Sequence, residues 1–227
     1  MNTYFAIITS KLHKNKSTGI VEKNLIGEYL PINPIIIEAG AHIGVDTIEM
    51  AKKWPKSVIY AFEPVPEIYS CLKKNTSCYK NIICIDKALD VACGEKQMFI
   101  SSGASDGSSS LLFPKEHLKE HPNVKFKKKI KVETITLESW IKRKNINKVD
   151  LLWLDLQGNE PFVLMESKRI LKKVRLIYTE VSLKENYSGS ILYPEFKNWL
   201  REQGFVVLKE ELRWRSAGNV LFINSSY

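Results

Sequence analysis

Seven short apolar runs, separated by segments with helical periodicity, constrain the fold of this chain more than any other sequence feature. Several runs are apolar at consecutive positions, which is typical of strands buried on both faces of a parallel sheet. The runs are IIIEA (35–39), SVIYAFE (57–63), NIICID (81–86), DLLWLD (150–155), LIYTEV (176–181), FVVLKE (205–210) and NVLFIN (219–224). The helices predicted between them span 45–54, 66–76, 137–145, 161–171 and 193–203, with Gly204 as a C-terminal cap. This order predicts an α/β fold with a doubly wound, mostly parallel sheet.

Three segments depart from the strand–helix alternation. No helix fits between the last two runs, which are therefore predicted to form an antiparallel pair at one side of the sheet. Residues 93–134 hold a short strand at 97–101 and a Gly/Ser-rich loop, and this insertion follows the third strand on the side where ligands bind in such folds. Residues 1–34 are predicted to be an N-terminal extension, with a strand and a helix that cover the sheet, and residues 35–227 the main domain.

The chain carries a formal net charge of +9, and five lysines fall within residues 125–131. A basic excess can attract nucleic acid, anionic lipid or acidic small molecules. We expect the lysine run to be a solvated connection flanking a strand, without a platform on which bases could stack.

No run reaches the roughly 20 apolar residues of a membrane-spanning helix, and the N-terminus lacks the basic start of a secretory signal. A cytoplasmic protein without a membrane span is therefore expected. The four cysteines have no CxxC spacing, so we expect them to be reduced and mostly buried.

The segment IIIEAGAHIGVDT carries the sharpest functional signal. A buried strand ends in Glu38 and continues through Gly40, Ala41 and Gly44 directly into a helix, and glycines there let a ligand approach the backbone closely. A dinucleotide fingerprint would place glycine where Glu38 stands, and a pyrophosphate would be repelled by this carboxylate. S-adenosylmethionine has no phosphate and carries a positive sulfonium and ammonium, which suit an acidic strand end.

Carboxylates also end the next two predicted strands. Glu63 lies 19 residues after Gly44, close to the spacing at which an acid binds the ribose hydroxyls in nucleotide-binding α/β folds. Asp86 ends the third strand, where it could accept a hydrogen bond from an adenine amino group. We therefore predict that both residues contact the cofactor.

At this point the sequence resembles the FkbM-type S-adenosylmethionine-dependent methyltransferases over roughly residues 35–207. The resemblance rests on the order and spacing of EAGAHIG, AFEP, DKALD, DGSSSL, LDLQGNE and EVSLKENYSG. It implies a class I methyltransferase fold, with a seven-stranded sheet containing one antiparallel strand, and methyl transfer to hydroxyl oxygens of sugars, glycans or natural products. It also implies cofactor contacts from Glu38, Gly40, Ala41, Gly44, Glu63 and Asp86. The chain departs from the family at Gln157, where glutamate is usual.

Transfer of a methyl group to a hydroxyl needs alignment of the reactants and a base for the released proton. Asp155, after the fourth strand, is the first candidate, either as this base or to orient the methionine ammonium. Glu180, at the end of the fifth strand, is a second candidate base. Glu160 either joins the site or opens the next helix, where an acid favours the helix dipole. Asp155 and Glu180 offer oxygens that a hard cation would accept, but no local cluster demands a metal, and none is expected.

Acceptor contacts are predicted at Ser109, Gln157 and Tyr187, and His42 either contacts methionine or faces solvent. The favoured partner is a small-molecule or glycan acceptor. An RNA methyltransferase is the second possibility because of the basic charge, although no RNA-binding module is recognisable. The third is a cofactor-binding module that has lost catalysis, suggested by Gln157.

Overall fold

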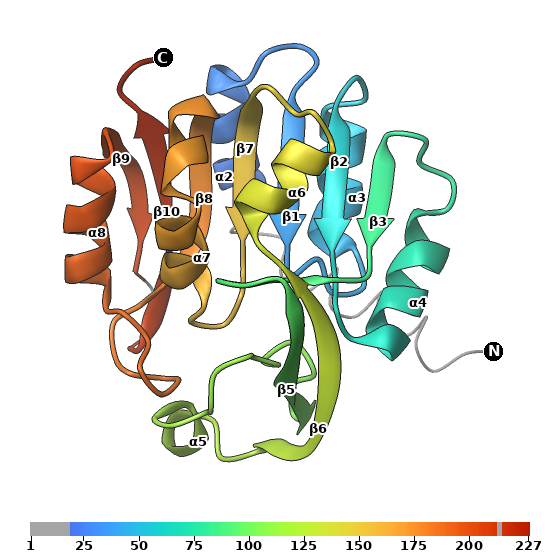
Figure 1. Ribbon diagram of the computed structural model, residues 1–227, viewed down its shortest axis with the longest axis vertical. Coiled ribbons are helices and arrows are strands. Elements are labelled where there is room, and N and C mark those ends of the chain that lie inside the picture. Colours follow the sequence, from blue (N-terminus) through green and yellow to red (C-terminus); the bar gives the residue numbers. More distant parts are fainter. Residues whose placement is uncertain (1–18, 213–214) are drawn as a thin grey trace.

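The computed structural model describes residues 19–212 and 215–227, with side chains from residue 23 onward. A seven-stranded sheet in the order β3-β2-β1-β7-β8-β10-β9 forms its centre (Figure 1). The strands are β1 (Ile35–Ala39), β2 (Val58–Phe62), β3 (Ile82–Ile85), β7 (Val149–Leu154), β8 (Val174–Ser182), β9 (Phe205–Glu211) and β10 (Ala217–Asn224). The predicted strands and the doubly wound sheet are confirmed.

β10 is the antiparallel strand of this sheet, since it pairs antiparallel with both β8 and β9, whereas the pairings among β3, β2, β1, β7 and β8 are parallel. The predicted antiparallel pair at one side is thus confirmed. The change of strand order between β1 and β7 lies at the centre of the sheet, and ligands bind beside such a switch point at the carboxyl ends of the strands.

Helices cover both faces of the sheet because alternate strand residues point to opposite faces. On one face α6 (Leu137–Arg143), α7 (Glu160–Glu166) and α8 (Tyr193–Glu202) pack around Ile37 and Leu152. On the other, α2 (Gly19–Tyr29), α3 (Val45–Lys53) and α4 (Pro66–Thr76) pack near Ile36 and Ile59 (Figure 1). The φ of Gly204, +89°, confirms the predicted cap after α8.

The helix predicted over 161–171 is shorter than expected. α7 ends at Glu166, and a separate 3₁₀ helix, η1, spans Lys168–Lys173. Ser167 between them is fully buried, and its hydroxyl accepts a hydrogen bond from the backbone N–H of Glu138 at the start of α6. This side-chain contact fixes the junction, which periodicity does not reveal.

The insertion after β3 forms a second, three-stranded sheet at the carboxyl edge of the main one, in the order β4-β6-β5 (Figure 1). This accessory sheet contains β4 (Ala88–Leu89), β5 (Gly94–Gly103) and β6 (Val124–Ile135), and the short helix α5 (His117–Glu120) precedes β6. Its position on the ligand side was predicted. The expectation that the lysine run is a connection was wrong, because residues 125–131 lie inside β6 and pair with β5.

In the N-terminal extension, the predicted helix is α2, which buries Ile26 against the sheet, and the predicted strand lies outside the described residues. None of the described helices has the length and apolar character needed to cross a membrane. The four cysteines are free, but the expectation that most are buried was wrong. Cys78 and Cys93 are exposed, and Cys71 and Cys84 are partly exposed.

Candidate functional site

The turn after β1 brings three segments into contact. The backbone N–H groups of Gly40 and Ala41 both donate to the carbonyl oxygen of Phe62 at the end of β2, and Asp155 N–H donates to Ala39 at the end of β1. Gly40 has a φ of +86°, and a Cβ there would lie 1.9 Å from the carbonyl oxygen of Asp155. Both its conformation and its space therefore require glycine.

The same turn continues through two more residues with positive φ. His42 has a φ of +50°, a conformation that non-glycine residues seldom adopt. Its Nε2 lies 3.4 Å from Asp106 Oδ1 in the loop after β5, residues 104–109, which we call the accessory loop. Gly44, with a φ of +89°, begins α3, and a Cβ on it would lie 2.7 Å from Leu72 of α4. Gly44 thus shapes the turn from behind, and it does not line the cavity described next.

A cavity of about 540 Å³ opens at this edge of the sheet. Its walls come from the glycine turn, the end of β2, the start of the accessory sheet and the loop after β7. The predicted site residues among its lining are Glu38, Gly40, Ala41, Glu63, Ser109, Asp155 and Gln157. A volume of this size is in the range of cofactor and small-ligand pockets.

Glu38 is 2% exposed, and its carboxylate accepts a hydrogen bond from Thr47 Oγ1 at 2.5 Å. Burial, first, and the neighbouring charge of Asp46 raise its pKa to about 8, against the opposing effects of the Thr47 hydrogen bond and of Lys23. Glu38 is therefore a buried acid that lines the cavity, and no cation from the described part of the chain is in direct contact with it. Binding of a positive group beside it would favour its ionised form.

Glu63 joins the glycine turn to the loop after β2. One carboxylate oxygen accepts from His42 N–H at 3.0 Å and the other from Val65 N–H at 2.8 Å. Burial raises its pKa, and these two hydrogen bonds oppose the shift. Glu63 therefore organises the backbone around the cavity, a role that sequence reasoning missed, and its predicted contact with ribose stays a prediction.

The structure does not bring Asp86 to the cavity. Asp86 directly follows β3 and is exposed, whereas Lys87, Ala88 and Leu89 line the wall at this position. Lys87 forms an ion pair with Glu133 of β6. The wall beside the end of β3 is consequently more apolar than the sequence indicated, and an adenine contact from Asp86 stays a prediction.

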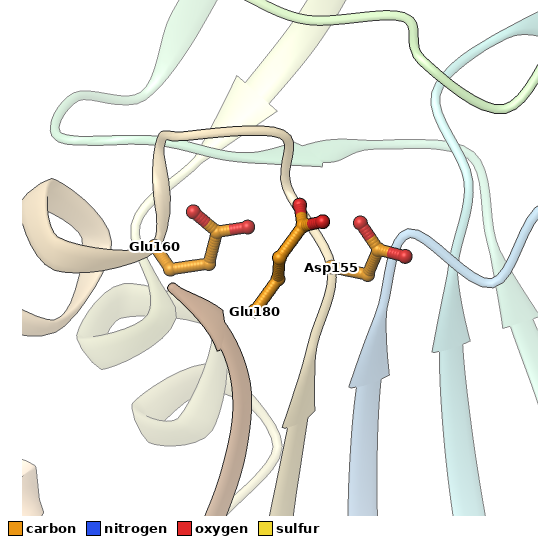
Figure 2. Close-up of side chains that lie close together, drawn as sticks. All are labelled: Asp155, Glu160 and Glu180. Atoms are coloured by element: carbon orange, nitrogen blue, oxygen red, sulfur yellow. The ribbon is translucent and has the colours of Figure 1, made fainter. Parts of the chain in front are cut away.

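Three carboxyl groups meet after β7: Asp155 from the strand end, Glu160 from the first turn of α7 and Glu180 from β8 (Figure 2). One oxygen of each lies within 4.8 Å of the others. Asp155 is open to the cavity, yet burial raises its pKa. Burial also raises the pKa of Glu160 to about 8 and that of Glu180 well above its ordinary value, and the neighbouring acids add to both shifts.

Glu160 has a structural role within this cluster. Its carboxylate accepts from the backbone N–H groups of Leu156 at 2.6 Å and Gly158 at 3.0 Å, so it closes the loop that it follows. The sequence left open whether Glu160 opens the helix or joins the site, and the structure shows both, since it is the first residue of α7.

Gln157 lies between two of the acids. Its Nε2 donates to Asp155 Oδ1 at 2.6 Å and to Glu180 Oε2 at 3.0 Å, and its Oε1 accepts from Tyr187 Oη at 2.8 Å. Its φ of +54° is again rare for a non-glycine residue, and such strain is concentrated at functional sites. A neutral amide that donates to two carboxylates stabilises them without a cation. The sequence shows no local cluster of ligands, whereas the structure brings the three acids together, so the expectation that no metal is held there stays a prediction.

The predicted acceptor residues surround this amide at different depths. Tyr187 is buried, and its hydroxyl shares its one proton between Gln157 Oε1 and the carbonyl oxygen of Ser108, which lies 2.9 Å away, so it joins the loop after β5 to the loop after β7. Ser110 donates to the backbone carbonyl of Gln157 at 2.9 Å. Ser109 lines the cavity, and its hydroxyl accepts from Ser101 N–H.

Two residues near the cavity were not found from the sequence. Lys23 of α2 is buried, and its Nζ lies 2.5 Å from Asp46 and 2.6 Å from Glu49. The same Nζ lies over the ring of Trp153, a residue that lines the cavity. Asn159 is buried, and its Nδ2 donates to the carbonyl of Leu89. Neither has a local motif; a lysine in a polar extension and an asparagine in a loop are ordinary surface residues in a sequence.

Comparison with known proteins identifies the family. The model of the methyltransferase FkbM domain matches residues 38–207, most of the chain. The chain belongs to the FkbM methyltransferase family. The predicted membership is confirmed, and the segment matched begins at Glu38 and includes the glycine turn, the accessory sheet and the carboxylate cluster.

Two curated relatives of this FkbM chain are described as methyltransferases. The chain is 30% identical over 185 residues to the 2-O-methyltransferase NoeI of Sinorhizobium fredii, covering 79% of this chain and 76% of the relative. It is 25% identical over 221 residues to methyltransferase sdnD of Sordaria araneosa, covering 82% and 78%. This FkbM protein is therefore a methyltransferase.

Solved structures show the fold family. Aeropyrum pernix fibrillarin, solved with natively bound S-adenosyl-L-methionine, aligns with a TM-score of 0.50 and 14% identity over 86% of this chain and 69% of that one. Fibrillarin of Methanococcus jannaschii gives a TM-score of 0.52 at 17% identity, covering 86% and 69%. The FkbM chain thus has the class I methyltransferase fold that the resemblance implied.

Proposed function

We propose that this protein uses S-adenosylmethionine to methylate a hydroxyl oxygen of a sugar, glycan or natural product. The observation that carries the proposal is the convergence of the glycine turn, buried Glu38 and Asp155 on one cavity. The hydroxyl acceptor is supported by the relative described as a 2-O-methyltransferase.

The residues of the cavity fit this cofactor. Gly40 leaves the backbone bare where a ligand can approach, and Glu38, Asp46 and Asp155 place on the wall acidic groups that a bound cation would hold in their ionised form. That wall suits a cationic sulfonium and ammonium and disfavours a pyrophosphate. Glu38, Gly40 and Ala41 would hold the methionine end, and Glu63 the ribose. When bound, S-adenosylmethionine supplies a methyl group on a positive sulfur that an oxygen can displace in line.

Asp155 is the proposed base. Its Oδ1 is held by Gln157, which leaves Oδ2 to accept the proton of an acceptor hydroxyl. Burial raises its pKa toward the operating pH, where a general base is most effective. Glu180 Oε2 accepts a hydrogen bond from the same Gln157 amide and helps to hold it in place, so the role of Glu180 is to position the base. Tyr187 completes this arrangement by donating to Gln157 Oε1.

The first experiment compares binding of S-adenosylmethionine and NAD by calorimetry. We expect binding of S-adenosylmethionine alone; binding of NAD alone would refute the cofactor assignment. A screen of hydroxylated acceptors then follows the formation of S-adenosylhomocysteine. Asp155→Asn should lose about 10²- to 10⁴-fold in turnover, much more than it weakens cofactor binding. A fully active variant would exclude Asp155 as the base.

The same screen addresses the other two candidate functions. A module without catalysis would bind the cofactor tightly and form no product with any acceptor. The tight contacts of Gln157 with Asp155, Glu180 and Tyr187 speak against such decay, because a site released from function has no reason to keep a strained residue. An RNA methyltransferase would bind polynucleotide with a steep dependence on salt.

A further inference from the structure

A second hollow, of about 460 Å³, lies on the accessory sheet. It is lined entirely by phenylalanine, proline, leucine, valine and lysine side chains, from β5, β6 and the segment around α5. We call it the basic groove. Its lining contains no carboxylate, amide or hydroxyl side chain, which sets its chemistry apart from that of the methyl-transfer cavity.

The basic groove and the methyl-transfer cavity share structural elements. Met98 lines the cavity and the next residue of β5, Phe99, lines the groove, so the two hollows lie on opposite faces of this strand. At the rim of the groove, Ser188 N–H donates to Phe113 O at 2.7 Å, and Pro114 forms a bridge with Tyr187. Tyr187 in turn donates to Gln157.

The charge of the groove is not neutralised by the protein. Lys125, Lys127 and Lys129 line it, and none of them forms an ion pair within residues 19–212 and 215–227. Lys125 donates to a backbone carbonyl only. By contrast Lys128 and Lys131 of the same strand pair with glutamates outside the groove. The groove therefore presents three uncompensated positive charges, which an anionic partner would complement.

The groove also presents apolar surface to solvent. Phe113 is 53% exposed, more than any other phenylalanine whose side chain the structure describes, and Leu118 of α5 is 41% exposed. Exposed apolar side chains ringed by lysines are the composition of segments that lie in a membrane interface, where the apolar groups enter the headgroup boundary and the cations meet anionic headgroups.

Other anionic partners fit less well. A glycan needs hydrogen-bonding side chains, and the groove offers lysines alone. A single-stranded polynucleotide needs several open rings on which bases can stack. Lys129 Nζ already lies 4.8 Å from the centre of the Phe99 ring, and Phe126 packs edge-on against His117, so Phe113 is left as the one well-exposed ring of the groove.

We infer that the basic groove docks this protein on the surface of membranes that contain anionic lipids, with Phe113 and Leu118 in the headgroup boundary and the three lysines on lipid phosphates. The inference does not depend on the proposed methyl transfer. It implies that acceptors carried by lipids are presented close to the methyl-transfer cavity, on the other face of β5.

The test is cosedimentation of the full chain with vesicles of phosphatidylcholine alone or with about one third phosphatidylglycerol. We expect binding only to the anionic vesicles. Lys127→Gln/Lys129→Gln should weaken it roughly 25-fold, since each lysine near an anionic surface contributes about fivefold. The matched control, Lys128→Gln/Lys131→Gln, changes the net charge equally on the same strand, and a weakening of fivefold or less is expected. Phe113→Ser should weaken binding about tenfold or more.

Three results would overturn the inference: no binding to either vesicle, equal losses in the two double variants, or binding of single-stranded polyuridine that depends on the groove while vesicle binding does not. Val206→Ser removes a similarly exposed apolar side chain from β9 and should leave vesicle binding unchanged. S-adenosylmethionine binding of the same samples is measured by calorimetry, so a failed cofactor assignment is seen separately from a failed docking surface.

Discussion

Glu38 allows a quantitative test of why an acid is buried at the end of β1. Its pKa is raised from 4.5 to about 8 in the folded chain. An acid whose pKa is raised in the folded state lowers the stability of the protein as pH rises, because the unfolded state ionises first. This loss of stability begins near pH 4.5 and is complete above pH 8. From these two values the cost is under about 1 kcal/mol at pH 5 and about 3 kcal/mol at pH 7, a difference of roughly 2 to 3 kcal/mol.

The perturbation is Glu38→Gln, which keeps an acceptor for the Thr47 hydroxyl and removes the titration. The free energy of urea unfolding is measured for the variant and the parent at pH 5 and pH 7 without cofactor. The stability advantage of the variant over the parent should be roughly 2 to 3 kcal/mol larger at pH 7 than at pH 5, and effects of the amide itself cancel in this comparison. Glu67→Gln, at an exposed acid whose pKa is lowered, should show almost no difference between the two values. An advantage independent of pH would refute the argument that burial raises this pKa.

The same group predicts a proton release. If S-adenosylmethionine places a cation beside Glu38, it ionises this carboxyl, so binding near pH 7 should release up to about one proton. Calorimetry in two buffers of different ionisation enthalpy measures this number. The release should disappear in Glu38→Gln, and a release that persists unchanged in the variant would place the cation elsewhere.

Three further substitutions test the site. Tyr187→Phe leaves Gln157 Oε1 without its donor and should cost about 1–3 kcal/mol of unfolding free energy together with a loss of turnover, as seen by urea unfolding and product formation. Gly40→Ala should lower the free energy of unfolding by about 3 kcal/mol or more, because its Cβ would clash with the carbonyl of Asp155. Gly189→Ala, measured by thermal unfolding in the same way, is the control for backbone strain alone, since Gly189 has a similar positive φ and a Cβ there would meet no atom within 4 Å. Gln157→Glu puts a third acid against two carboxylates and should lower stability by about 3 kcal/mol at pH 8 and little at pH 5; equal loss at both pH values would contradict this.

The main sheet is almost fully readable from the sequence because its signals are local. β1 occupies the predicted residues, and α4 spans Pro66–Thr76 as its proline start indicates. Consecutive apolar residues and periodic helices are set by burial within one element. The accessory sheet is harder to predict from the sequence. β6 alternates lysine with other residues on a solvent-exposed hairpin, so the apolar pattern of a buried strand is missing. Its strand character comes from pairing with β5, which local sequence does not encode.

The candidate site was predictable where a strand end fixes the position. Glu38 and Asp155 terminate adjacent strands and line the cavity as the topology requires. The sequence does not reveal the hydrogen-bond partners of each side chain. Glu63 is at the expected place, yet both of its oxygens hold backbone amides. Lys23 comes from the N-terminal helix, and its approach to Asp46 depends on tertiary packing alone.

Gln157 shows how the negative charge of this edge is managed. Asp155, Glu160 and Glu180 bring three acids together. Desolvation raises the pKa of each, and the charge of Asp155 raises the pKa values of Glu160 and Glu180 as well. A glutamate at 157, usual in the family that the sequence resembles, would need a proton or a cation to face two of them. The amide of Gln157 donates to Asp155 and Glu180 through Nε2, and its Oε1 accepts a hydrogen bond from Tyr187. The substitution therefore exchanges one way of compensating the charge for another and keeps the geometry around the proposed base.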